Sequence, residues 1–135
     1  KAAKKVRERN MCRVKHNFSY VPCKVGVIYK IPLSCDKVYM GQTGRCINVR
    51  LREHERSLEI GRGSNLAVHC KGCDGCQPYL THTVILDSHP AQINREIIEA
   101  RHIIRLGANC VGEPSIALTD NEVEFLERGV CGGLS

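Results

Sequence analysis

The sequence has no tryptophan and only four tyrosines and two phenylalanines among its 135 residues. A folded core built from it must therefore be mostly aliphatic. No apolar run approaches the roughly 20 residues that a membrane-spanning helix needs, and no secretory signal is recognisable, so we expect no membrane partner. The length suits one domain with a modest core. Because the first residue is Lys and not Met, we expect the chain to be cut from a longer protein.

Acidic residues are in deficit: 14 Asp and Glu stand against 20 Lys and Arg, which gives a net charge of +6. This balance suits a polyanionic partner. Many of the basic residues gather in residues 1–15, which read as a solvated linker or fraying helix, or as an arm that contacts phosphates or carries a nuclear address. The candidate DNA contacts are Lys4, Lys5, Arg7, Arg45 and Arg52.

Cysteine, by contrast, is abundant, with nine in the chain. The odd number and the spacing Cys70-x2-Cys73-x2-Cys76 favour a reduced protein with a metal site; a disulfide framework is the alternative. Cys12 and Cys23 flank aromatic residues and show no metal-like partner nearby, so we expect both to be buried small hydrophobes.

Apolar, β-branched residues at 25–31 and 38–41 predict two strands of a hairpin around a turn at 32–37. We expect Gly41 and Gly44 to bracket a loop. Helical spacing then recurs at Ile47, Leu51, His54 and Leu58.

Further along the chain, residues 79–86 alternate and predict a third strand. A helix is expected to start at residues 88–90, to run to about Leu106 and to be closed by Gly107. A capping box at residues 119–122 predicts a last helix to about Arg128.

Polar residues concentrate on the hairpin and the helix after it. Tyr29 and Tyr39 lie on the two paired strands, and Arg50 and His54, four residues apart, share one face of the helix. A short length of chain therefore builds one polar cluster.

Residues 26–29 read Gly-Val-Ile-Tyr and residues 39–41 read Tyr-Met-Gly. These two motifs, with the later Arg50 and His54, resemble the GIY-YIG nuclease module. The sequence around these motifs is most similar to the endonuclease domain of Penelope-like retroelements. The first motif is one residue longer than its name, and Met40 replaces Ile, a volume-conserving change. The resemblance covers roughly residues 23–126.

The resemblance implies a small α/β domain in which a three-stranded, mostly antiparallel sheet is flanked by helices, in the order ββαβα plus a terminal helix. The expected organisation is a basic arm at 1–22, an endonuclease domain at 23–128 with a zinc-binding insertion near 66–77, and a tail at 129–135.

It also implies phosphodiester hydrolysis, which needs a base for water, a positive group for the developing charge and a metal ion. Tyr29 would help to activate the water and Tyr39 would orient the water or the phosphate. Arg50 would stabilise the phosphate, and His54 would assist proton transfer or hold the water network.

The family has one essential Glu on the helix that ends near Leu106, and this Glu binds a catalytic Mg²⁺ or Mn²⁺. Here Glu99 and Glu96 compete for that role, with Glu99 preferred. Asn109 corresponds only loosely to the family's late, supporting Asn.

Penelope-like endonucleases also carry a Cys-x-Cys between the two tyrosine motifs and two further ligands after the first helix. Leu33 stands here in place of the first Cys, and Cys35 remains. The zinc ligands that we predict, with Cys70 as a substitute, are Cys35, His69, Cys73 and Cys76. The cases for His82, His89 and His102 are weaker.

The predicted function is a metal-dependent nickase of double-stranded DNA. By resemblance, its nick would prime reverse transcription in the nucleus, with an attached reverse transcriptase and the element RNA as partners. The alternatives are a zinc-stabilised DNA-binding module with a degenerate nuclease core, and a repair or homing-type GIY-YIG nuclease.

Overall fold

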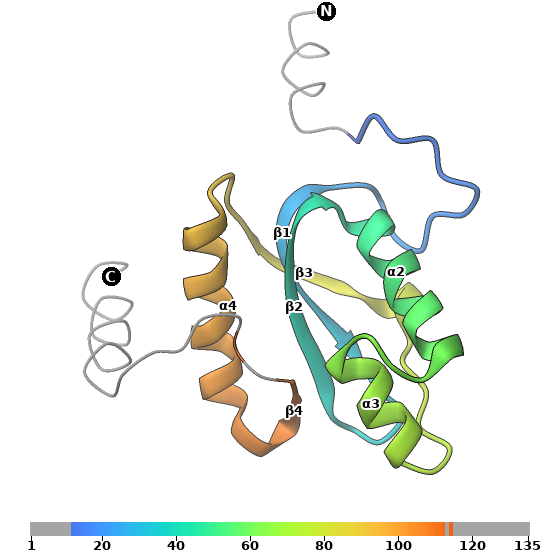
Figure 1. Cartoon of the computed structure of the whole chain (residues 1–135). Coiled ribbons are helices and arrows are strands. Elements are labelled where there is room, and N and C mark those ends of the chain that lie inside the picture. The colour runs from blue at the N-terminus through green and yellow to red at the C-terminus, as the bar shows by residue number, and fades with distance from the viewer. Residues whose placement is uncertain (1–11, 113, 115–135) are drawn as a thin grey trace, which may run out of the picture.

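The computed structural model describes residues 12–112 and 114. A β-sheet lies between helix α4 on one face and helices α2 and α3 on the other (Figure 1). The strands are β1 (Val25–Pro32), β2 (Val38–Cys46), β3 (Val84–Ser88) and β4 (Cys110–Val111). The helices are α2 (Ile47–Ile60), α3 (Asn65–Gly72) and α4 (Gln92–Leu106), with 3-10 turns at Leu80–His82 and Gly107–Asn109.

The sheet has four strands in the order β3-β1-β2-β4. β1 pairs antiparallel with β2 and with β3, whereas β4 runs parallel to β2. The α/β class was predicted correctly, but the three-stranded sheet was wrong, because the sheet has a fourth strand and is mixed. Two residues are too few to leave an alternating pattern in the sequence, so β4 could not be recognised.

Strand β2 continues through Gly41 and Gly44 to Cys46, where we expected a loop. Neither glycine makes a turn. A side chain on Gly41 would collide with Tyr29, and one on Gly44 would collide with Arg95. Both glycines therefore serve close packing within a strand, which is the other common reason for glycine there.

Helix α3 was also unexpected, because its residues read as a Cys-rich loop. The Ser64 hydroxyl caps it by accepting a hydrogen bond from the Ala67 amide at 3.1 Å. β3 begins at Val84 and not at Tyr79, since the Thr83 hydroxyl donates to the Leu80 carbonyl at 2.7 Å and closes a 3-10 turn. Helix α4 begins at Gln92, later than predicted, because residue 88 still belongs to β3.

Alternate residues of β1 face opposite sides of the sheet. Val27, Tyr29 and Ile31 belong to the larger core cluster, which is shared with α2 and α3. Ile28 belongs to a smaller cluster together with Ile103 of α4. The sheet thus has two buried faces, and Tyr29 lies on the face that α2 covers.

Parts of the prediction fall on residues that the structure does not describe: the arm before Cys12, the helix at 119–128 and the tail. Within the described part of the chain, no helix combines the length and the apolar character needed to cross a membrane.

Candidate active site and metal centres

The centre of the candidate active site is a hydrogen bond between β1 and α2. The Tyr29 hydroxyl lies 2.8 Å from His54 Nε2, and neither side chain has exposed surface. The apolar spacing of α2 turns His54 toward the sheet together with Leu51. The sequence placed these two residues in one cluster, and the structure brings them into contact.

The glycines of the two motifs have separate physical roles. Gly41 is the register partner of Tyr29 on β2, and a Cβ atom at Gly41 would lie 2.5 Å from the Tyr29 hydroxyl oxygen. Gly26 has a φ of +65°, which disfavours a side chain, and its carbonyl accepts a hydrogen bond from the His89 amide at 2.9 Å. One glycine makes room for the catalytic candidate, and the other sets the start of β1.

The ring of Tyr39 also contacts that of His54, in an edge-to-face arrangement with ring centroids 5.0 Å apart at 75°. Burial, with a further contribution from the positive Arg50, lowers the pKa of His54 to about 3, so the ring is neutral at pH 7. Burial also raises the pKa of Tyr29 and that of Tyr39. The pair therefore consists of a neutral imidazole and a protonated phenol.

Arg50 lies beside this pair and keeps 30% of its side chain exposed. Burial lowers the pKa of its guanidinium, but Tyr29, Tyr39 and Glu53 outweigh this effect, so the net shift is upward. Arg50 donates to a Glu53 carboxylate oxygen at 3.0 Å. It is thus a permanent positive charge at the edge of the buried cluster.

The same Glu53 binds Arg45 through two hydrogen bonds of 2.7 and 2.8 Å, which lower the pKa of the carboxyl group. Arg45, a predicted DNA contact, is therefore already held in an ion pair on the surface. Arg52, the next candidate, is exposed. The other predicted DNA contacts, Lys4, Lys5 and Arg7, lie outside the described residues.

Glu99 and Glu96 differ clearly in their surroundings. Glu99 is 4% exposed, and its negative charge contributes to the raised pKa of both Tyr29 and Tyr39. Glu96 is partly exposed on the same helix. Of the two carboxylates, Glu99 belongs to the electrostatic environment of the tyrosines.

The structure also brings the four predicted zinc ligands together. One donor atom from each of Cys35, His69, Cys73 and Cys76 lies within 4.8 Å of the others, and Cys35 Sγ is 3.4 Å from His69 Nε2. Cys70 is not part of this group; burial, with Cys76 nearby, raises the pKa of its thiol to about 12. Three thiols and one imidazole form a donor set suited to structural zinc.

Hydrogen bonds between Ser34 and Gln77 hold the two segments of this group together. The Ser34 amide donates to the Gln77 carbonyl at 2.9 Å, and the Gln77 amide donates to the Ser34 hydroxyl at 2.8 Å. Leu33 forms a β-bridge with Pro78. The hairpin turn is thus joined to the segment after α3, which itself carries His69.

A second Cys/His group was missed by the sequence reasoning. Cys12, His16, Cys23 and Cys46 also place their donor atoms within 4.8 Å of one another. The expectation that Cys12 and Cys23 are buried hydrophobes was wrong, since Cys23 is exposed and Cys12 only partly buried. The short spacing Cys12-x3-His16-x6-Cys23 was the available signal, but the fourth member is distant in sequence.

Arg95 was missed as well, because a lone arginine on a helix is usually a surface residue. It is 6% exposed and donates to the Gln42 side chain at 3.0 Å and to the carbonyls of His89 and Pro90, each at 2.9 Å. It fastens α4 to β2 and to the loop after β3.

Comparison of the chain with protein-family models, with curated proteins and with solved structures gives no match. Over residues 12–112, the fold and the site define only a class: an α/β domain with a mixed sheet and two Cys/His groups that could each hold a metal ion.

Proposed function

We propose that this chain is a divalent-metal-dependent DNA endonuclease of the GIY-YIG type. The observation that carries the proposal is the buried contact of 2.8 Å between Tyr29 and His54, with Tyr39 against the same imidazole and Arg50 at the edge. A tyrosine and a neutral histidine can supply the base for water, and an arginine can supply the positive group for the phosphate, that hydrolysis of a phosphodiester needs.

A proton path can run along the hydrogen bond between Tyr29 and His54. In the closed site the lowered pKa of His54 and the raised pKa of Tyr29 oppose transfer of the phenol proton to Nε2. When the site opens to water and a metal ion, the effect of burial is relieved, both pKa values move toward their ordinary values, and Nε2 can accept the Tyr29 proton. The Tyr29 oxygen can then take a proton from an attacking water molecule. Because Tyr29 has no exposed surface, the site must open beside its hydroxyl before water can reach it. Catalytic geometry often tightens only when substrate is bound.

The negative charge that develops on the phosphate needs a positive partner. The partly exposed Arg50 guanidinium can donate two parallel hydrogen bonds to phosphate oxygens. Glu99 is the residue that would hold Mg²⁺ or Mn²⁺, since a carboxylate oxygen suits these hard cations. Such an ion supplies Lewis-acid stabilisation of the phosphate oxygens.

One active site per chain cuts one strand at a time, so the expected product is a nick with a free 3′ hydroxyl. Following the resemblance to Penelope-like endonucleases, we propose that this nick primes reverse transcription in the nucleus. The partners would then be double-stranded DNA, an attached reverse transcriptase and the element RNA. We further propose that Cys35, His69, Cys73 and Cys76 bind zinc.

The test is relaxation of supercoiled plasmid in Mg²⁺ or Mn²⁺ by the wild type and by Tyr29→Phe, Glu99→Ala and Glu96→Ala. Removing a proton-transfer group costs about 10²- to 10⁴-fold in rate. We therefore expect Tyr29→Phe to nick at least about 100-fold more slowly. We expect Glu99→Ala to lose nicking because it removes the proposed ligand of the catalytic metal ion. Glu96→Ala is the matched control and should nick at the wild-type rate.

DNA binding by each variant, measured separately at one salt concentration, shows whether a loss belongs to chemistry or to binding. A wild type that binds plasmid without nicking it, or four proteins that nick equally, would overturn the nuclease assignment.

A second function has one observation in its favour. Tyr29 and His54 have no exposed surface, as expected if the nuclease core were degenerate and the domain only bound DNA. Salt-dependent DNA binding without turnover would support that reading. A repair or homing-type nuclease would nick plasmid in the same way, and target preference would separate it from a retroelement enzyme.

A further inference from the structure

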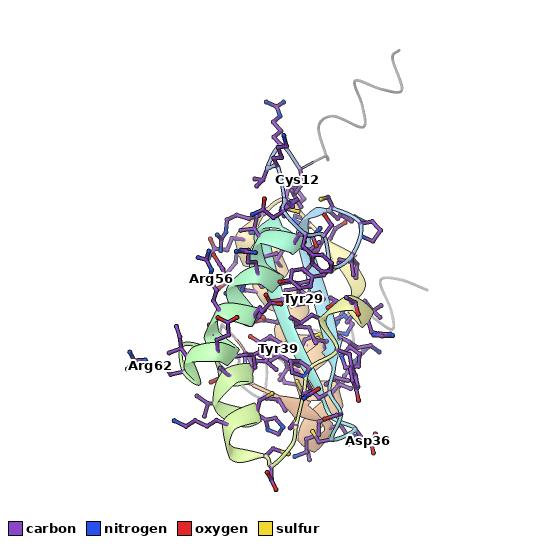
Figure 2. All side chains as sticks on the ribbon, turned by 90° about the vertical axis from the view of Figure 1, so that its right-hand side faces the viewer. Cys12, Tyr29, Asp36, Tyr39, Arg56 and Arg62 are labelled. Atoms are coloured by element: carbon purple, nitrogen blue, oxygen red, sulfur yellow. The ribbon has the colours of Figure 1, made fainter. Side chains whose placement is uncertain are left out.

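The second Cys/His group lies at the opposite end of the molecule from the first. Figure 2 shows Cys12 at one end and Asp36, the neighbour of the ligand candidate Cys35, at the other. Cys12 and His16 belong to the segment before β1, and Cys23 lies just before that strand. Cys46 ends β2 and is the N-cap residue of α2. The group therefore joins the N-terminal segment to the junction of β2 and α2.

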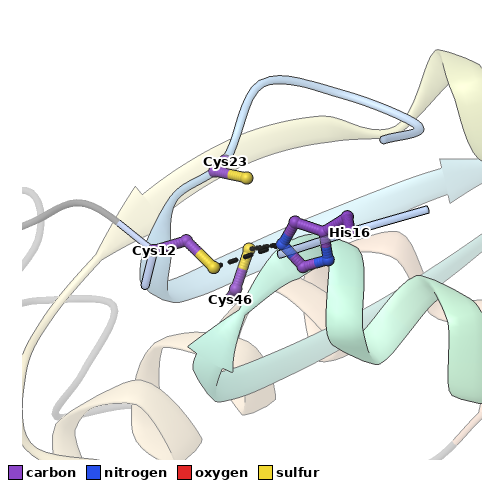
Figure 3. A group of neighbouring side chains, drawn as sticks. All are labelled: Cys12, His16, Cys23 and Cys46. Carbon is purple, nitrogen blue, oxygen red and sulfur yellow. Dashed lines mark hydrogen bonds between the residues drawn. The ribbon is translucent and has the colours of Figure 1, made fainter. Parts of the chain in front are cut away.

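The four side chains are neighbours, and hydrogen bonds join one ring nitrogen of His16 to Cys12 and Cys46 (Figure 3). His16 Nε2 lies 3.2 Å from Cys12 Sγ and 3.5 Å from Cys46 Sγ. In a tetrahedral zinc site with metal–sulfur bonds of about 2.3 Å and metal–nitrogen bonds of about 2.0–2.1 Å, the ligand sulfur and nitrogen are about 3.5 Å apart. The spacing therefore matches that of zinc ligands, as does the 3.4 Å between Cys35 and His69.

We propose that Cys12, His16, Cys23 and Cys46 bind a second structural zinc ion, separate from the ion proposed for Cys35, His69, Cys73 and Cys76. The proposal does not depend on nuclease activity. All four donor positions are filled by protein, which is the arrangement of a structural and not a catalytic zinc.

Hydrogen-bond donors around the group support this role. The Val14 amide donates to Cys12 Sγ at 3.2 Å, and the Asn48 side-chain amide reaches Cys23 Sγ at 3.4 Å. N–H groups directed at ligand sulfurs stabilise their negative charge, as the outer partners of metal ligands commonly do.

Asn48 links the N-terminal segment to helix α2 through side-chain hydrogen bonds. It is 1% exposed, accepts from the Tyr20 amide at 2.8 Å and donates to the Val21 carbonyl at 2.8 Å. It therefore fixes the backbone before Cys23 to the first turn of α2, so that Cys23 is held beside Cys46.

The segment 12–23 contains no helix or strand of its own. A metal ion would supply the cross-link that regular hydrogen bonding does not.

Lys15, Arg52 and Arg56 line a pocket between this segment and α2. The zinc would thus hold a basic surface in place on the helix that carries Arg50, and the basic residues 1–11 directly precede this segment in the sequence.

The experiment counts zinc ions per chain in the full 135-residue protein by atomic emission after exhaustive removal of loosely bound metal. We expect two for the wild type and one each for Cys12→Ser and Cys73→Ser. The double variant should hold none. Cys110→Ser is the matched control, because Cys110 belongs to neither group, and it should keep two.

Substitution with Co²⁺ adds a readout of the ligands. Each group has three thiols, so we expect the thiolate-to-cobalt absorption of each single variant to be about half that of the wild type. Cys12 lies outside the sheet and the helices, so circular dichroism should show a folded protein in Cys12→Ser. If that variant unfolds, the exposed Cys23 offers Cys23→Ser as its replacement.

Two results would overturn the proposal: folded Cys12→Ser that holds as much zinc as the wild type, or a disulfide among Cys12, Cys23 and Cys46 in the mass of the unreduced protein. If each single variant loses one zinc ion but still nicks plasmid at the wild-type rate, the zinc site is confirmed and is shown to be independent of catalysis.

Discussion

At the scale of single residues, Gly41 makes the position of the Tyr29 hydroxyl possible. A methyl group at Gly41 would meet that oxygen at 2.5 Å and the ring carbon Cζ at 2.6 Å. We predict that Gly41→Ala displaces the ring and breaks the hydrogen bond to His54. Overpacking of this kind costs about 1–3 kcal/mol, which urea unfolding would measure, and nicking should fall with it.

Gly72→Ala is the control, since no atom would lie within 4 Å of the added methyl group. Gly72 ends helix α3, where alanine is favoured by up to about 1 kcal/mol. Equal unfolding free energies for wild type and Gly41→Ala would show that Tyr29 is not confined as described.

The residues of the candidate site differ in how far the sequence could reveal them. Tyr29, Tyr39, Arg50 and His54 lie within 26 residues of chain, and local strand and helix periodicity was enough to place them together. His16 and Cys46 are 30 residues apart and meet only through the fold. Cys46 left no local pattern, so the spacing of Cys12, His16 and Cys23 was the one signal from which this second Cys/His group could have been found.

At the scale of elements, β1, the start of α2 and the end of α4 agree with the prediction, because long apolar runs and a terminal glycine carry strong signals. The elements that were missed have weak signals. Strand β4 has two residues, and α3 is an eight-residue helix that contains Cys70, one of the cysteines that suggested a loop. Gly41 and Gly44 led to the wrong prediction of a loop because glycine favours turns. In the structure both lie in β2, where close packing leaves no room for a side chain.

The link between the hairpin turn and α3 leads to the element-scale prediction. Cys35 lies in the turn, while His69 and Cys73 belong to α3 and its C-cap. If the free zinc concentration is about 1,000 times the Kd, zinc binding stabilises the folded state by about 4 kcal/mol. We predict that Cys73→Ser lowers the melting temperature and that a chelator lowers it further only through the second metal group.

Cys70→Ser is the matched control for that prediction. Cys70 is close in sequence to Cys73 but outside the ligand group, so the variant should keep its zinc and most of the effect of chelation. If Cys70→Ser loses zinc and Cys73→Ser does not, Cys70 is the ligand and the group must be reassigned.

At the scale of the whole molecule, the pH dependence of stability reports the buried histidine. Burial, with Arg50 nearby, gives folded His54 a pKa of about 3, against about 6.5 in an unfolded chain. Between these values the unfolded state binds more protons, so stability is fully present above about pH 6.5 and falls as the pH decreases. The total loss from this one residue is about 5 kcal/mol at most.

We predict that the unfolding free energy of the wild type decreases between pH 6.5 and pH 5 more steeply than that of His54→Gln, by about 1.4 kcal/mol per pH unit below pH 6. Glutamine keeps a polar group near the Tyr29 hydroxyl but does not titrate. Glu53, whose pKa is lowered by Arg45, is present in both proteins, as are all other titrating groups, so the difference between the two slopes isolates His54. Urea unfolding followed by circular dichroism at pH 7, 6 and 5 measures both slopes. Equal slopes would mean that folded His54 titrates near its ordinary pKa, so that burial does not hold it neutral and the closed pair of Tyr29 and His54 described above is wrong.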